Sequence, residues 1–148
     1  MGLGGIILRK KDKMNLEETK DLMISILERL SYSYSMSEEK NKRGRKYYFC
    51  GVGEYRGSEK GFVMYLEGES DPPDRNYEEW IDSDLGKVLH IEDISDSEDM
   101  LLRILYEYFK VHPNDYFFDD LDWYYKKKEI DRIYNSDDWE DWPYKNPN

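Results

Sequence analysis

The chain has 148 residues, the length of one ordinary domain, and 33 acidic against 22 basic residues give it a net charge of −11. This charge excludes a general nucleic-acid binder, which needs a basic surface to neutralise phosphates, and it opposes binding to anionic membranes. No apolar stretch approaches the roughly 20 residues of a membrane span, and a single cysteine cannot form an internal disulfide, so we expect a cytoplasmic protein without a membrane partner.

Aromatic side chains provide much of the apolar surface that a hydrophobic core could bury. The chain contains 14 Tyr, 5 Phe and 4 Trp residues, whereas its mean hydropathy is only −0.95. Each aromatic side chain can bury roughly 150–250 Å², so the composition predicts a folded domain with a Tyr-rich core.

The first half of the chain begins with a basic segment and a helix. Residues 1–13 carry a net charge of +3, and we predict that they form a flexible N-terminal segment before a second plausible start at Met14. Asn15 and Glu18 have the spacing of a capping box, and apolar residues follow at helical spacing to about residue 32. Residues 33–45 are rich in Ser and charge, which predicts a loop.

Strand patterns follow this loop. Residues 46–53 and 62–67 are rich in aromatic and branched side chains and are separated by a polar link with two glycines, which predicts a β-hairpin. The Pro-rich residues 71–74 end the second strand, and a third strand is predicted at residues 87–91.

Two helices are predicted in the second half of the chain. Ser95 and Glu98 form a second capping box, and apolar spacing continues to Val111, just before Pro113. We expect residues 116–118 in the core and a short helix at residues 127–134. The predicted fold is α+β, with a small antiparallel sheet of about three or more strands and helices packed on one face. A single domain of residues 14–134 would then be followed by an acidic, Trp-containing tail, residues 135–148.

Several chemistries find no support in the spacing of residues. His90 and His112 are 22 positions apart and Cys50 is alone, so no zinc ligand pair is present, and we expect no metal and no cofactor. Cys50 lies in the middle of a predicted strand, where a buried thiol is expected. Glycine-rich phosphate loops are absent.

Acidic residues alternate with aromatic residues near the C-terminus, and this pattern predicts a protein interface. Interfaces are enriched in Trp and Tyr, and carboxylates around such anchors attract a basic partner. The predicted partner-binding residues are Asp119, Asp120, Asp122, Trp123, Tyr124, Asp137, Asp138, Trp139, Glu140, Asp141 and Trp142. We predict that charge reversal in the tail slows association with the partner.

The chain resembles the small acidic immunity proteins of bacterial polymorphic and contact-dependent toxin systems. The resemblance lies in size, acidity and the segment YFKVHPNDYF, residues 108–117. It implies a non-catalytic inhibitor that binds one cognate toxin, such as a basic nuclease, and blocks its active site.

Two other functions remain open from the sequence. One is an acidic nucleic-acid mimic that inhibits a host defence nuclease, which would need carboxylates at phosphate-like spacing. The other is an enzyme that uses Cys50 or paired carboxylates, which would need a pocket beside Cys50 and a lowered thiol pKa.

Overall fold

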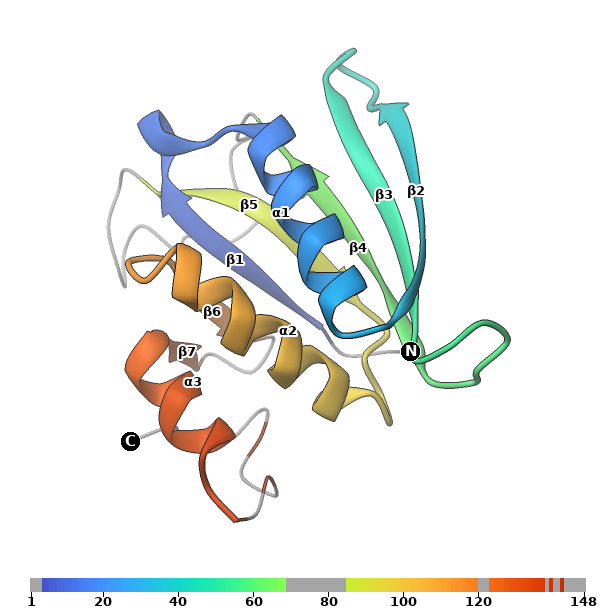
Figure 1. Cartoon of the computed structure of the whole chain (residues 1–148). Coiled ribbons are helices and arrows are strands. Elements are labelled where there is room, and N and C mark those ends of the chain that lie inside the picture. The colour runs from blue at the N-terminus through green and yellow to red at the C-terminus, as the bar shows by residue number, and fades with distance from the viewer. Residues whose placement is uncertain (1–3, 69–84, 120–122, 138, 140–141, 143–148) are drawn as a thin grey trace.

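The computed structural model describes residues 4–68, 85–119, 123–137, 139 and 142 (Figure 1). The chain order of the elements is β1 (Gly5–Lys10), η1 (Lys11–Lys13), α1 (Leu16–Arg29), β2 (Ser33–Lys40), β3 (Lys46–Gly53), β4 (Gly61–Glu67), β5 (Leu85–Glu92), α2 (Glu98–Val111), β6 (Tyr116–Asp119), β7 (Tyr124–Tyr125) and α3 (Lys127–Tyr134). The break predicted at residues 71–74 lies outside the described residues.

The α+β class is confirmed, but the sheet is larger than the sequence predicted. Seven strands form one sheet in the order β2-β3-β4-β5-β1-β6-β7, and every neighbouring pair is antiparallel. The helices lie side by side in the order α1, α2, α3 (Figure 1). No helix within the described ranges is long and apolar enough to cross a membrane.

The N-terminal segment belongs to the sheet, so the prediction that residues 1–13 are flexible is wrong for β1. This strand lies between β5 and β6 and pairs with both. Its residues from Gly5 to Arg9 are buried. The physical reason is the short apolar run from Ile6 to Leu8, which suits an inner strand with neighbours on both sides.

The prediction of a loop at residues 33–45 is also wrong, because Ser33–Lys40 is an eight-residue edge strand. It pairs along its full length with β3, from Ser33 opposite Gly53 to Lys40 opposite Lys46. Its Ser and Glu residues are poor strand formers, but a polar strand is tolerated at an edge, where one side faces water. Only Tyr34 and Met36 of this strand pack against the core.

The other predicted elements are confirmed with small changes at their ends. The Asn15 side chain accepts a hydrogen bond of 3.1 Å from the Glu18 backbone N–H, so it caps α1 as predicted. Helix α1 ends three residues early, before Ser31, whose φ of 61° is incompatible with a helix. Helix α2 begins at Glu98 with Ser97, not Ser95, at its N-cap.

The main core lies between the helices and the sheet. It contains Met23, Ile26 and Leu27 of α1, most apolar residues of α2, and Ile130 and Ile133 of α3. From the sheet it receives alternate residues of β3 and β4, such as Cys50 and Met64. We call the side of the sheet that carries these residues the inner face and the opposite side the outer face.

Candidate functional site

One predicted interface residue, Asp119, is buried and has a structural role. None of its surface is exposed. Its carboxylate accepts hydrogen bonds from the Trp123 backbone N–H at 3.1 Å and from the Tyr125 hydroxyl at 3.2 Å. It therefore connects the end of β6 to Trp123 and Tyr125, and its assignment as a surface contact is wrong.

Trp142 is likewise a core residue and not an exposed anchor. Its exposed fraction is 6%, and its ring lies 5.5 Å from Phe117 and 5.2 Å from Tyr125, measured between centroids. The indole N–H donates a 2.7 Å hydrogen bond to the carbonyl oxygen of Glu98 at the start of α2. An indole buried with its N–H paired is a stable arrangement, so this part of the predicted tail is packed against the domain.

The other predicted interface residues differ in exposure. Trp139 is half-buried, with its ring 5.4 Å from Tyr134 and under the Arg103 guanidinium at 5.2 Å. Trp123 packs against the main core, whereas Tyr124, 43% exposed, and Asp137 are open to solvent. Five predicted residues lie outside the described ones: Asp120, Asp122, Asp138, Glu140 and Asp141.

A half-exposed aromatic patch lies elsewhere, on the outer face of the sheet. The strand registers place one row of residues across all seven strands: Ser37, Phe49, Tyr65, His90, Ile6, Phe118 and Tyr124. Ile6 and Phe118 of this row are buried, but its residues on β3, β4 and β5 are half-exposed. We define the outer-face patch as Tyr47, Phe49, Tyr65 and His90.

The rings of the outer-face patch contact one another around Tyr65. Its centroid lies 5.3 Å from Phe49 in an edge-to-face arrangement, 6.2 Å from Tyr47 and 6.0 Å from His90. These separations are within the range in which aromatic pairs stabilise a surface. Burial raises the pKa of Tyr65 and nearby Glu92 raises it further, so the Tyr65 hydroxyl is neutral at pH 7 and can donate a hydrogen bond.

Carboxylates border the outer-face patch. Glu39 and Glu67 are the cross-strand neighbours of Tyr47 on its two sides. Glu92 approaches His90 to 3.5 Å and its side chain is 44% exposed. Lys87, 3.2 Å from Glu67, is a basic residue that contacts this border. The patch therefore combines half-exposed rings with a negative rim.

A hollow of about 540 Å³ adjoins the patch at the turn between β3 and β4. Its floor includes Gly51 and Gly53, and a methyl group added at Gly53 would lie 2.8 Å from the Ser33 hydroxyl. Tyr55 stands at its margin with 60% of its surface exposed.

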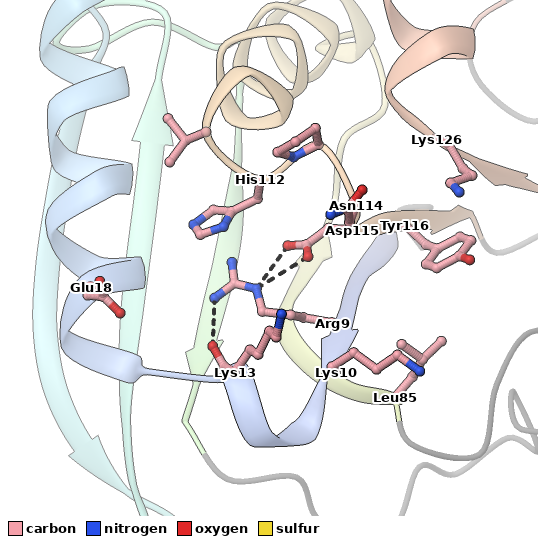
Figure 2. Close-up of a pocket in the computed structure, with 12 residues that line it drawn as sticks. Arg9, Lys10, Lys13, Glu18, Leu85, His112, Asn114, Asp115, Tyr116 and Lys126 are labelled. Atoms are coloured by element: carbon pink, nitrogen blue, oxygen red, sulfur yellow. Dashed lines mark hydrogen bonds and ion pairs between the residues drawn. The ribbon is translucent and has the colours of Figure 1, made fainter.

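A second concave site lies where η1, the α2–β6 loop and the start of α3 meet (Figure 2). This cavity has a volume of about 560 Å³. Its lining includes Arg9, Lys10, Lys13, Lys126 and His112, with Glu18 and Asp115 as the acidic members. We call it the basic cavity.

A buried ionic network forms the floor of the basic cavity. Arg9 Nε lies 3.0 Å and 3.3 Å from the two carboxylate oxygens of Asp115, and both side chains are 6% exposed. Arg9 Nη2 donates to the Tyr108 hydroxyl at 2.7 Å, and this hydroxyl donates to Asp115 at 2.7 Å. Arg9 Nη1 reaches the carbonyl oxygen of Lys13 at 3.5 Å, as Figure 2 shows.

The protonation states of this network follow from its burial. Burial, together with the Asp115 carboxylate, raises the pKa of Tyr108 well above its ordinary value of 10.0. Burial alone would lower the pKa of Arg9, but Tyr108 and Asp115 outweigh it, and the net pKa of Arg9 is raised. Tyr108 is therefore a neutral phenol between a cation and an anion, which satisfies both.

His112 lies beside Arg9 and is held neutral. Partial burial lowers its pKa below 6.5, and the positive charge of Arg9 lowers it further. The ring lies 5.3 Å from Tyr108, and its nitrogens have no hydrogen-bond partner among the described residues. A neutral imidazole offers one N–H donor and one acceptor to a ligand in the basic cavity.

Cys50 does not have the environment of a nucleophile. Its side chain is fully buried, and burial raises the pKa of the thiol to about 12. Cys50 pairs with Met64 on the inner face, whereas His90 pairs with Tyr65 on the outer face, so Cys50 and His90 lie on opposite sides of the sheet. Among the described residues, no group of three or more His, Cys, Asp or Glu side chains could hold a metal ion.

Comparisons of the chain with protein-family models, with curated proteins and with solved structures give no match. The sites therefore stand on their own geometry. The outer-face patch had a sequence signal that pattern reading did not use: Tyr47 and Phe49 alternate with Tyr48 and Cys50, so both faces of β3 carry large side chains.

Proposed function

We propose that this protein is an inhibitor that binds a basic protein, of the kind that the small acidic immunity proteins represent, and that it blocks the active site of a toxin such as a nuclease. The observation that carries the proposal is the outer-face patch, in which half-exposed aromatic rings are bordered by carboxylates. Aromatic side chains that cluster on a surface accessible to solvent are enriched at protein interfaces.

The charge of the chain supports a basic partner. A net charge of −11 repels nucleic acid and other acidic proteins, whereas it accelerates the approach of a basic surface at low salt. Nuclease active sites are basic because they bind phosphates, so a negative rim around rigid rings suits such a cleft. Tyr65, Phe49 and Tyr47 would provide the contact area, and Glu39 and Glu92 would set the orientation.

The architecture of the patch suits tight binding. The rings lie on three adjacent strands of a seven-stranded sheet, so their backbone positions are fixed before binding. A surface fixed in advance loses little conformational entropy on association. Occlusion of an active site requires only shape and charge, which agrees with a non-catalytic role.

The first experiment is a capture experiment with three forms of the full chain immobilised side by side. One form is unchanged, one carries Glu39→Lys and Glu92→Lys, and one carries Asp21→Lys and Asp137→Lys. The two variants have the same net charge, but Asp21 lies on the exposed side of α1 and Asp137 lies near the C-terminal end, where the sequence predicted the interface. Proteins retained from a lysate of the source organism at low and high salt are identified by mass spectrometry.

We expect one basic protein to be retained by the unchanged chain and by the Asp21/Asp137 variant, to be lost from the Glu39/Glu92 variant, and to be released by salt. Once identified, that protein should be toxic to cells when it is expressed alone and harmless when it is co-expressed with the unchanged chain. Equal retention by the Glu39/Glu92 variant would exclude the outer-face patch. Loss only from the Asp21/Asp137 variant would restore the predicted tail interface.

A further inference from the structure

Two basic segments that are far apart in the sequence meet at the basic cavity. Residues 9–13 carry four basic side chains and one acidic one, and residues 126–128 are three consecutive lysines. The fold brings the end of β1 and η1 beside the start of α3, and Arg9, Lys10, Lys13 and Lys126 line the same cavity. In a chain of net charge −11, this concentration of positive charge is a strong local departure from the overall charge.

Some hydrogen-bond donors of the cavity are bound by other groups of the protein, and others have no partner among the described residues. Arg9 directs three of its nitrogens to Asp115, Tyr108 and the Lys13 carbonyl oxygen, so its guanidinium is occupied by the protein itself. The ammonium group of Lys13 has no ion-pair partner within the described part of the chain. The ring nitrogens of His112 also lack a hydrogen-bond partner there.

Lys126 adds a second ammonium group at the opposite wall. Its Nζ lies 5.1 Å from the ring centroid of Tyr116, above one face of the ring, and this contact keeps it at the cavity margin. Leu85, Val111, Pro113 and Tyr116 form apolar walls between the polar groups. Polar groups at a few fixed points between apolar walls are typical of small-molecule sites.

We propose that the basic cavity binds a small phosphate monoester, with the phosphate group at Lys13 and His112 and the organic group along Pro113 and Tyr116 toward Lys126 (Figure 2). Arg9 and Asp115 neutralise each other, which leaves Lys13 and Lys126 against the single carboxylate of Glu18 in the lining, so the ligand is an anion. It carries a phosphate and not a carboxylate for two reasons. First, the Arg9 guanidinium, which could bind a planar carboxylate through two parallel hydrogen bonds, is already occupied by groups of the protein. Second, lysine ammonium groups act as point charges that suit a phosphate dianion.

This site involves no residue of the outer-face patch and does not depend on the proposed inhibitor function. Its size also limits the ligand. A cavity of about 560 Å³ is within the range that takes one small molecule. His112, held neutral, offers an N–H donor to a phosphate oxygen without adding charge.

The test is a titration of the ¹⁵N-labelled full chain with inorganic phosphate and with phenyl phosphate, followed by amide chemical shifts at constant ionic strength. We expect saturable shifts at residues 9–13, 112–116 and 126, with a dissociation constant of about 1 mM or below for phenyl phosphate. Inorganic phosphate should bind about tenfold more weakly, because it leaves the apolar wall uncovered; burial of roughly 55 Å² of apolar surface is sufficient for a tenfold difference.

Two matched variants make the test specific. Lys13→Gln should weaken phenyl phosphate binding at least about fivefold, because it removes the ammonium group that contacts the phosphate. Lys42→Gln makes the same change in net charge at an exposed position in the β2–β3 turn, and it should leave binding unchanged. Their amide spectra show directly that both variants are folded.

Three results would overturn the proposal. One is the absence of saturable shifts at the cavity residues with either probe. Another is equal binding by Lys13→Gln and Lys42→Gln, which would mean a diffuse charge effect. The third is equal binding of acetate and phenyl phosphate at the cavity, which would contradict the phosphate class.

Discussion

The buried pair of Arg9 and Asp115 allows a quantitative test of the fold around the basic cavity. Each side chain is 6% exposed, and Arg9 Nε lies 3.0 Å from the carboxylate. The centres of the two charges are then ~4 Å apart, and at an effective dielectric constant of about 20 their attraction is about 4 kcal/mol. Removal of one partner also leaves the other charge buried without compensation, which costs about 3–5 kcal/mol in comparable pairs.

The perturbation is a double-mutant cycle with Arg9→Met, Asp115→Asn and the two changes together. Each single change should lower the free energy of unfolding by about 3–5 kcal/mol. The double variant should be more stable than the sum of the single changes by at least about 2 kcal/mol, because no uncompensated charge remains and the amide oxygen introduced by Asp115→Asn can still accept from Tyr108. Urea unfolding followed by Trp fluorescence measures all four forms, and a loss of about 4 kcal/mol lowers the midpoint by about 2 M.

Arg29 supplies the matched control for this cycle. Its Nη1 lies 2.9 Å from Glu107, as close as the buried pair, but its side chain is 58% exposed. Arg29→Met should therefore cost no more than about 1 kcal/mol. If Arg9→Met and Arg29→Met had equal effects, or if the Arg9 and Asp115 changes were additive, burial would not be the source of the energy and the reasoning would fail.

Two further predictions concern the C-terminal aromatics and pH. Trp142→Ala should lower the free energy of unfolding by about 3–5 kcal/mol in urea, because it empties a core position and leaves the Glu98 carbonyl without its donor; an effect below about 0.5 kcal/mol would return this residue to an exposed tail. Because the pKa of His112 is lowered in the folded state, the unfolded chain binds the proton more strongly, and stability should fall as the pH drops below 6.5. His112→Gln should make the free energy of unfolding in urea depend less on pH between neutral and mildly acidic conditions. If the pH dependence of this variant is unchanged, other groups cause the loss of stability.

The elements that the sequence predicted well are those whose pattern is complete within the element. Helix α1 has its cap, its apolar stripe and its acidic first turn within one short segment, and β3 and β4 have strong strand formers. Strand β2 has no such pattern, because Ser and Glu dominate it and its pairing with β3 supplies the order. For β1, the apolar run from Ile6 to Leu8 was a usable signal, but the basic residues that follow it suggested a flexible segment.

The candidate site was harder to predict, because exposure is decided by tertiary packing. Trp142 and Asp119 both lie among charges in the sequence, which is the pattern of a surface, yet Trp142 packs against Phe117, and Asp119 is buried and accepts hydrogen bonds from Trp123 and Tyr125. The outer-face patch depends on register, because Phe49, Tyr65 and His90 are far apart in the sequence and become neighbours only when three strands align. The basic cavity likewise forms only when the fold brings residues 9 and 126, which are far apart in the sequence, to the same cavity.

The inner position of β1 has a consequence for the order in which the chain assembles. β1 is the first of the seven strands to leave the ribosome, but its two neighbours are β5 and β6, which begin at Leu85 and Tyr116. At about 5–20 residues per second, the second neighbour follows roughly 5–20 s later. Until β5 has been made, the run from Ile6 to Leu8 has no strand beside it, and until β6 follows it can pair on one side only, so it is open to association with other chains.

Closure of this sheet therefore comes late in folding, after most of the chain has been made. A chain that began at Met14 would lack the strand that joins β2–β5 to β6–β7, and each half would present an unpaired inner edge. The N-terminal strand β1 connects the two parts of the sheet through its pairing with β5 and β6. Arg9 on the same strand also binds Asp115 in the loop after α2.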